Sequence, residues 1–271
     1  MILIQPHIAS FQKFIWDFYA HNKREFAWRA TDDPYAIMVS EIMLQQTQTH
    51  RVVPKFELWL MEFPDFQTLA DASLRDVLSV WSGLGYNRRA IALQKNAQRV
   101  VAEFDGALPN DVVVLQRFSA IGPNTAASIC AFAFNAPTVF IETNIRAVYI
   151  HSFFKDRTDV TDKEIAILVA QTVDKNSPRE WYYALMDYGV WLKSQHVNPN
   201  RKSAHHTKQS KFEGSDRQVR GMMLRFLTAA PCSMFDLITQ SKKEATRVER
   251  IVSDLCAEGF IKQVDGVYQI M

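Results

Sequence analysis

The stretch DPYAIMVSEIMLQQTQTH, residues 33–50, places the carboxylate of Glu41 within an apolar run. On a helix, its neighbours three and four residues away are Ile37, Met38, Leu44 and Gln45. An apolar environment raises the pKa of a carboxyl group and is costly unless the group is paired or used. Glu41 is therefore a candidate general acid, although a glutamate that reaches solvent from the helix edge fits the same periodicity.

Glutamines follow this carboxylate at positions 45, 46 and 48. Their amides carry both donors and acceptors, which can read the edge of a nucleobase or wedge into a base stack. A polar helix surface explains the same glutamines equally well. Both interpretations stay open on this segment alone.

A second informative segment is LQRFSAIGPNTAASICAFAF, residues 115–134, which predicts two helices joined by a tight turn. The amide N–H groups of such a turn, with the N-terminus of the following helix, can bind a DNA phosphate without a charged side chain. Gly122 supplies a glycine where the backbone must approach a ligand, and Pro123-Asn124-Thr125 predicts a helix start. A single glycine also fits an ordinary helix cap.

The third segment is APTVFIETNIRAVYIHSFF, residues 136–154. An apolar run leads into Glu142-Thr143-Asn144 and then into a predicted helix that carries Arg146. A carboxylate near a helix start commonly complements the helix dipole, which is the simplest explanation for Glu142.

The first 190 residues are predicted to form a mainly helical body. Apolar residues recur at helical spacing up to about that point, and breakers such as Asp32-Asp33-Pro34 and Gly83-Leu84-Gly85 separate the segments. Residues 191–214 are polar and basic and lack periodicity, which predicts a linker.

The C-terminal residues 215–271 follow a different pattern. Helix-like segments over 215–229, 233–239 and 243–258 precede two alternating segments around Asp265-Gly266, a strong hairpin-turn signal. Three helices plus a terminal hairpin is the layout of a winged helix-turn-helix domain. Such a domain usually contacts DNA, but it also serves in protein docking or as a purely structural piece.

The net charge of the 271-residue chain is only +2, so bulk charge does not indicate a nucleic-acid partner. One run, KSQHVNPNRKSAHHTKQSK, is basic and contains no acid. Its cations are Lys193, Arg201, Lys202, Lys208 and Lys211. The run predicts either a solvated linker or a contact to DNA phosphates.

Cysteine usage and hydropathy exclude several classes of protein. Cys130, Cys232 and Cys256 have no short spacing between them, which excludes a local metal knuckle or a disulfide framework. No apolar stretch approaches the roughly 18 to 20 residues that span a bilayer, and no secretion signal is recognisable. We expect a cytoplasmic, nucleoid-associated protein of bacterial type with no membrane partner.

Three motifs together resemble a known family. FAWRATDDPYAIMVSEIMLQQTQ, VWSGLGYNRRA and LMDYG resemble the corresponding motifs of the helix-hairpin-helix DNA glycosylases, most closely those of the MutY-type adenine glycosylases. The likeness covers about residues 26–190. It implies a mainly α fold: a two-lobed helix-hairpin-helix body, followed here by the winged-helix-like domain.

The resemblance assigns roles to particular residues. It makes Glu41 the catalytic glutamate, with Glu142 as the second carboxylate, and the 115–130 hairpin the phosphate anchor. The residues expected to form the base pocket or to probe the base stack are Gln45, Gln46, Asn124, Tyr86 and Asn144. The residues expected to contact the DNA backbone are Gly83, Gly85, Arg88, Gly122, Thr125, Lys193, Arg201, Lys202 and Lys208.

The chain departs from the family pattern in four ways. The hairpin has Ala120 where the family has a glycine, and Glu142 replaces the family aspartate, which shifts the charge by over an ångström unless the backbone retreats. The four cysteines that bind an iron-sulfur cluster are absent, so we expect no cofactor. We also expect no counterpart of the family's C-terminal domain that reads 8-oxoguanine, because the winged-helix-like segment stands in its place.

These residues predict a base-excision reaction. The enzyme would flip a damaged or mispaired base out of duplex DNA, and two carboxylates would manage the proton and the oxocarbenium charge as the base departs. Relatives that also nick the strand carry an amine where this chain has Asn124, so a monofunctional glycosylase without AP-lyase activity is expected.

The residues leave the choice of base open. The amide of Asn124 suits paired hydrogen bonds to a uracil-like base, which slightly favours uracil or 5-hydroxymethyluracil. The alternative is a MutY-like glycosylase that removes adenine opposite 8-oxoguanine or guanine. A second alternative is a non-catalytic protein that binds DNA lesions or regulates transcription. We expect duplex DNA as the partner and a monomeric protein.

Overall fold

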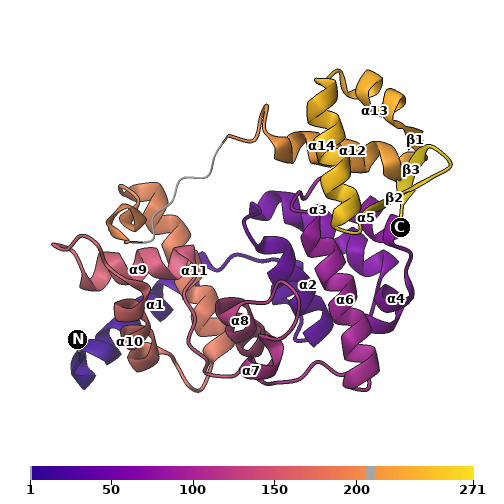
Figure 1. The fold of residues 1–271 in the computed structure, drawn as a ribbon. Coiled ribbons are helices and arrows are strands. Elements are labelled where there is room, and N and C mark those ends of the chain that lie inside the picture. The colour runs from indigo at the N-terminus through magenta and orange to yellow at the C-terminus, as the bar shows by residue number, and fades with distance from the viewer. Residues whose placement is uncertain (1, 205–210) are drawn as a thin grey trace. The chain divides into compact units, whose positions relative to one another are not determined.

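The computed structural model describes residues 2–204 and 211–271, and helices dominate both ranges (Figure 1). The expected mainly helical class is confirmed. The chain divides into two compact units, Met1–Glu41 with Pro109–Lys208 and Ile42–Leu108 with Gln209–Met271. None of the described helices combines the length and apolarity needed to cross a membrane.

The first unit is built around α11. Its elements are α1 (Gln5–Asn22), η1 (Ala27–Arg29), most of α2 (Pro34–Leu44), α7 (Val112–Leu115), α8 (Pro123–Phe134), α9 (Thr143–Phe153), α10 (Asp162–Thr172), α11 (Pro178–Gln195) and η2 (Pro199–Lys202). Pro178 occupies the first turn of α11, where its fixed φ angle favours a helix start. Both α1 and α9 pack against α11, and Ile15, Ile145 and Trp181 are fully buried in this core.

Gly189 allows the close approach of α11 to α9. A Cβ atom at this position would lie 2.6 Å from the backbone oxygen of Asn144, a distance that no side chain tolerates. The glycine therefore brings the α11 backbone against the first turn of α9.

The structure corrects the linker predicted over residues 191–214. Helix α11 continues to Gln195, η2 follows, and the backbone N–H of Val160 donates to the Lys202 carbonyl at 2.9 Å. Asn200 is buried, and its Nδ2 donates to the Thr143 carbonyl at 2.9 Å. The basic composition of the run predicted solvent exposure, so these buried positions were not expected. Residues 205–210, which include Lys208, lie outside the described residues.

The second unit joins the middle of the chain to its C-terminus. Its elements are α3 (Thr49–Glu62), α4 (Phe66–Asp71), α5 (Leu74–Trp81), α6 (Arg88–Glu103), α12 (Asp216–Ala229), β1 (Cys232–Ser233), α13 (Met234–Ser241), α14 (Ala245–Ala257), β2 (Ile261–Val264) and β3 (Val267–Ile270). Trp59 and Trp81 are fully buried, with ring centroids 5.5 Å apart. Because α12 packs against α5, the C-terminal residues share this unit and are not the separate domain predicted over 215–271.

The C-terminal elements contain the three helices and the hairpin that the sequence predicts. The strands form one antiparallel sheet in the order β1-β3-β2. Val264 pairs with Val267, so Asp265 and Gly266 form a two-residue turn with φ angles of 49° and 83°. The expected hairpin turn is confirmed, whereas assignment of the whole segment as a winged helix stays a prediction.

Candidate active site

Glu41 lies on α2 between buried residues, and its own side chain is half-buried. The Ser128 hydroxyl of α8 donates a hydrogen bond to Glu41 Oε2. Burial raises the pKa of Glu41 to about 7; the hydrogen bond from Ser128 opposes this rise, and the negative charge of Glu142 adds to it. Near neutral pH the carboxyl group can therefore both hold and release a proton.

Ser128 can follow the protonation of Glu41. Its hydroxyl oxygen also lies 3.1 Å from the Thr125 carbonyl, and a hydroxyl has only one proton to donate. When Glu41 is ionised, Ser128 donates to it; when Glu41 is protonated, the acid can donate to Ser128 and Ser128 to Thr125. Ser128 was not predicted as a site residue, although a polar residue inside the apolar helix α8 was a signal for it.

Glu142 is the N-cap of α9. Its Oε1 accepts from the backbone N–H groups of Asn144 at 2.8 Å and Ile145 at 3.0 Å, and Asn144 Nδ2 donates to Oε2 at 3.2 Å. These bonds and the helix dipole fix the position of a negative charge. Dipole complementation is thus part of its role, and its negative charge also raises the pKa of Glu41.

Asn144 holds the first turn of α9 in place. Besides its bond to Glu142, its backbone faces Gly189 of α11 at the close approach described above. Its Oδ1 atom is buried without a hydrogen-bond partner among the described residues. A buried acceptor of this kind is available to a donor that the protein itself does not supply.

Asn124 lies exposed in the first turn of α8. Its Oδ1 accepts from the backbone N–H of Ile141 at 3.2 Å, which ties α8 to the segment before Glu142. The amide oxygen is therefore engaged in the fold. This geometry argues against the paired hydrogen bonds to a uracil-like base for which Asn124 was singled out.

The predicted hairpin lies between α7 and α8. Ala120 has a φ angle of +58°, a conformation that favours glycine, whereas Gly122 has a φ angle of −84°. Gly122 is exposed, and a Cβ atom there would meet nothing within 4 Å. The fold thus does not require a glycine at position 122. A glycine there fits a position where a ligand approaches the backbone. Thr125 follows half-buried in the same turn of α8.

A buried ion cluster fixes the segment before α2. The Asp187 side chain of α11 is only 1% exposed, and it accepts from Arg24 Nε at 2.7 Å and from both terminal nitrogens of Arg29 at 2.9 Å. This cluster was not predicted, although Arg29 and Asp187 lie in the family-like motifs FAWRATDD and LMDYG. A buried charge pair of this kind is costly to break from one side.

The basic positions of the supposed linker have different environments. Lys193 is half-buried in the last turn of α11; burial lowers the pKa of its amine, and the charge of Glu142 raises it. Lys202 donates to the Lys155 carbonyl, and Arg201 is exposed. Of the positions predicted to contact DNA here, Lys193 therefore lies within the electrostatic reach of Glu142.

The remaining predicted residues belong to the second unit. Gln45 and Gln46 follow the end of α2, and Gln46 is exposed with a φ angle of 53°. Gly83 and Gly85 both have positive φ angles, in the loop that carries Tyr86. Arg88, at the start of α6, is exposed but paired with Glu258 at 2.7 Å.

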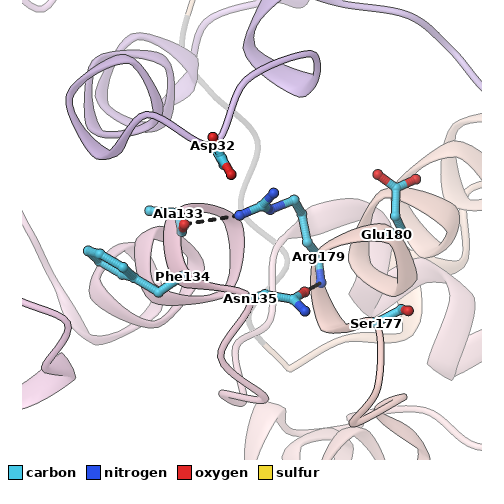
Figure 2. A pocket seen from close by; sticks show the side chains of 7 residues that line it. All are labelled: Asp32, Ala133, Phe134, Asn135, Ser177, Arg179 and Glu180. Carbon is cyan, nitrogen blue, oxygen red and sulfur yellow. Dashed lines mark hydrogen bonds between the residues drawn. The ribbon is translucent and has the colours of Figure 1, made fainter.

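A cavity of about 460 Å³ lies at the C-terminal end of α8, and Figure 2 shows the side chains around it. It is lined by Asp32, Ala133, Phe134, Asn135, Ser177, Arg179 and Glu180. Arg179 Nη2 donates to the Ala133 carbonyl at 3.0 Å, so its guanidinium caps the carboxyl end of α8. None of the predicted site residues lines this cavity.

No group of three or more histidine, cysteine or acidic side chains within the described ranges could hold a metal ion. The family's iron-sulfur cluster needs four cysteines, and the chain has three. Cys130 lies on α8, whereas Cys232 and Cys256 belong to the second unit. The donor set therefore does not fit that cluster.

Comparison with known proteins identifies the family. Residues 39–175 match the model of HhH-GPD superfamily base excision DNA repair proteins. The adenine DNA glycosylase of Buchnera aphidicola is 33% identical over 187 residues, which cover 67% of this chain and 52% of that protein. The adenine DNA glycosylase of Mycobacterium tuberculosis is 27% identical over 97% of this chain and 94% of its own length. The chain thus spans about half of one curated relative and nearly all of another.

Solved structures share the fold. A thermostable thymine-DNA glycosylase superposes with a TM-score of 0.64 and 21% identity over 73% of this chain and 92% of its own. An endonuclease III bound to DNA superposes with a TM-score of 0.60 and 15% identity over 69% and 86%. The expected resemblance and fold class are confirmed.

Proposed function

The chain belongs to the HhH-GPD superfamily of base excision DNA repair proteins, and we propose that this DNA glycosylase removes adenine from a damaged or mispaired site in duplex DNA. The observation that carries the proposal is the Glu41 carboxyl group, which bonds to Ser128 and has a pKa of about 7. Full-length similarity to an adenine DNA glycosylase supports the choice of base.

The chemistry of the leaving group favours adenine over uracil for such a site. Adenine departs poorly as an anion, so it needs an acid that protonates a ring nitrogen, whereas uracil is the better anionic leaving group. A carboxyl group that still holds its proton near neutral pH can supply that proton. After the base departs, the same Glu41 carboxylate can accept a proton from the attacking water.

Glu142 suits the second role. Departure of the base leaves positive oxocarbenium character on the sugar, which a fixed negative charge stabilises. The three hydrogen bonds at the start of α9 hold this carboxylate in place before the reaction begins. Such preorganisation spares the cost of turning a charge toward the sugar during the reaction.

The slight preference for a pyrimidine is not supported. It rested on the Asn124 amide, together with Glu142 in place of the family aspartate and the absence of the 8-oxoguanine-reading domain. The Asn124 oxygen accepts a hydrogen bond from Ile141 N, and the curated relatives are adenine glycosylases. The alternative from the sequence, adenine opposite 8-oxoguanine or guanine, is better supported. We also propose that the enzyme works without an iron-sulfur cluster and without AP-lyase activity, since Asn124 offers no amine.

A panel of end-labelled duplexes tests the proposal. The duplexes carry adenine opposite 8-oxoguanine or guanine, uracil opposite guanine, and 5-hydroxymethyluracil opposite guanine. We expect strand breaks only at adenine and only after hot alkali. Breaks confined to the uracil-type duplexes would refute the choice of base, and breaks without alkali would refute the monofunctional reaction. Binding without any break would leave the non-catalytic alternative.

A further inference from the structure

The loop between α5 and α6 displays an aromatic ring from a constrained backbone. Gly83, Gly85 and Tyr86 have φ angles of 97°, 75° and 47°. Tyr86 is 39% exposed, and a bulky residue adopts a positive φ angle only where its surroundings hold it. Trp81 Nε1 donates to the Gly85 carbonyl at 2.9 Å, which fixes the loop from the core side.

The phenol end of Tyr86 is held by the C-terminal part of the chain. Arg217, in the first turn of α12, donates from Nη1 to Tyr86 Oη at 2.9 Å, and its guanidinium lies 5.9 Å from the ring centroid. The guanidinium of Arg89 lies 5.3 Å from the same centroid. Arg89 is itself immobilised, because its side chain is buried and donates to the Ile42 and Met43 carbonyls at 2.8 and 3.0 Å.

A second set of contacts holds Arg88, the first residue of α6, two residues after Tyr86. Glu258, at the end of α14, accepts from Arg88 Nε at 2.8 Å and from Arg220 Nη1 at 2.9 Å. These arginines hold the pKa of Glu258 at about 2, so the carboxylate stays ionised under all ordinary conditions. Arg220 lies one turn after Arg217 on α12. The C-terminal segment therefore contacts Tyr86 through Arg217 and Arg88 through Glu258.

Two further arginines of this segment also serve internal contacts. Arg247 and Arg250 of α14 donate to Asp216 at 2.8 and 2.6 Å, beside Arg217 at the start of α12. In a DNA-reading helix-turn-helix domain, the corresponding helix enters the major groove and presents such side chains to bases. Here these two guanidinium groups are engaged in fixing α12.

We propose that Arg217 is a positioning residue that holds the Tyr86 ring ready to enter the base stack of the target duplex. On this view residues 211–271 assist excision by fixing a loop of their own unit. The inference rests on the proposed function, because an inserted ring assists only an enzyme that extrudes a base. An aromatic ring that is already fixed loses less conformational entropy when a base stacks on it.

The first test compares two arginines of α12. R217A removes the bond to Tyr86, and R225A removes an exposed arginine of the same helix as the matched control. Single-turnover excision from an adenine and 8-oxoguanine duplex should slow about tenfold in R217A, the factor carried by one hydrogen bond from a charged donor. R225A should stay near wild type, and R217K, which keeps a donor, should recover part of the rate.

A second readout separates positioning from structure. The fluorescence of 2-aminopurine placed beside the target adenine reports unstacking, and R217A should reduce its rise while the Kd for an undamaged duplex stays unchanged. Melting temperatures of all variants exclude unfolding as the cause. If R217A and R225A match wild type in both rate and fluorescence, the inference fails although excision itself stands.

The hydroxyl of Tyr86 supplies the decisive comparison. Y86F keeps the ring and removes the acceptor, so it should lose the same factor as R217A, and the double variant should be no slower than either single variant. Independent, multiplying losses would mean that Arg217 acts elsewhere, for example on a phosphate, and would overturn the proposal. If wild-type protein excises no base, the proposed function fails, whereas the fluorescence comparison still tests the role of Arg217.

Discussion

Glu41 lies on a helix between buried neighbours and shares a hydrogen bond with Ser128, whereas Tyr86 lies on an exposed loop gripped by arginines. In the first region, burial away from water raises the pKa of Glu41 to about 7, where the carboxyl group can donate a proton near neutral pH. In the second region, charge and hydrogen bonds hold a ring that must stay accessible. An acid that transfers a proton and a ring that enters a duplex thus need opposite environments.

The largest effect should follow from removing the acid. E41Q keeps the shape of the side chain and a hydrogen bond to Ser128 but cannot transfer a proton, so excision should fall about 10³-fold. Single-turnover rates measure the loss, and duplex affinity should change little. A modest loss of rate would show that the buried region does not depend on proton transfer.

Packing around two helical glycines differs, because Gly189 lies against another helix and Gly221 has open space beside it. G189A would force a Cβ atom against Asn144, so we expect it to lower the free energy of unfolding by about 2 kcal/mol. G221A, inside α12, meets nothing within 4 Å and should instead stabilise by up to about 1 kcal/mol. Denaturant midpoints check both, and equal effects would refute the close approach of α9 and α11.

The pH profile can sharpen the account of Glu41. Its hydrogen bond from Ser128 lowers the pKa, so S128A should raise the pKa above about 7. Because the protonated form is the acid, the loss of rate on the alkaline side should then move to higher pH, by about one unit. S40A is the control, since the Ser40 hydroxyl donates to the Ile37 carbonyl. An unmoved alkaline limb would contradict the role of Ser128.

The smallest effect concerns the hairpin. Ala120 has a φ angle of +58°, where glycine is at ease, so A120G should stabilise the protein by roughly 0.5–1 kcal/mol after the entropy of the unfolded chain is included. A126G, in the interior of α8, should destabilise by about 1 kcal/mol. Thermal unfolding compares the two, and destabilisation by A120G would show that the turn is not strained.

Local features of both regions were predictable from the sequence. Periodicity around Glu41 indicated a buried acid, and Asp265-Gly266 indicated a tight hairpin, because each signal lies within a few residues. The contact of Ser128 with Glu41 spans 87 positions, and that of Arg24 with Asp187 spans 163. No periodicity encodes such pairings.

Charged residues gave signals in the sequence that did not indicate burial or ion pairing. Charges such as those of Lys193 and Lys202 made residues 191–214 resemble a solvated linker, although Leu192 and Asn200 within this range are buried. The contact of Arg88 with DNA stays a prediction, but its pairing with Glu258, 170 positions away, gave no signal in the sequence. The sequence gives the charge of a residue, but it does not give the residue that forms an ion pair with it.

The discontinuous make-up of both units has a consequence for synthesis on the ribosome. Helices α3 to α6 emerge early, yet α12, which packs against α5, is translated only after residue 215. The face of α5 that contacts α12 must therefore stay uncovered while residues 82–215 are translated. Truncated products that stop before α12 should accordingly be prone to chaperone capture and degradation.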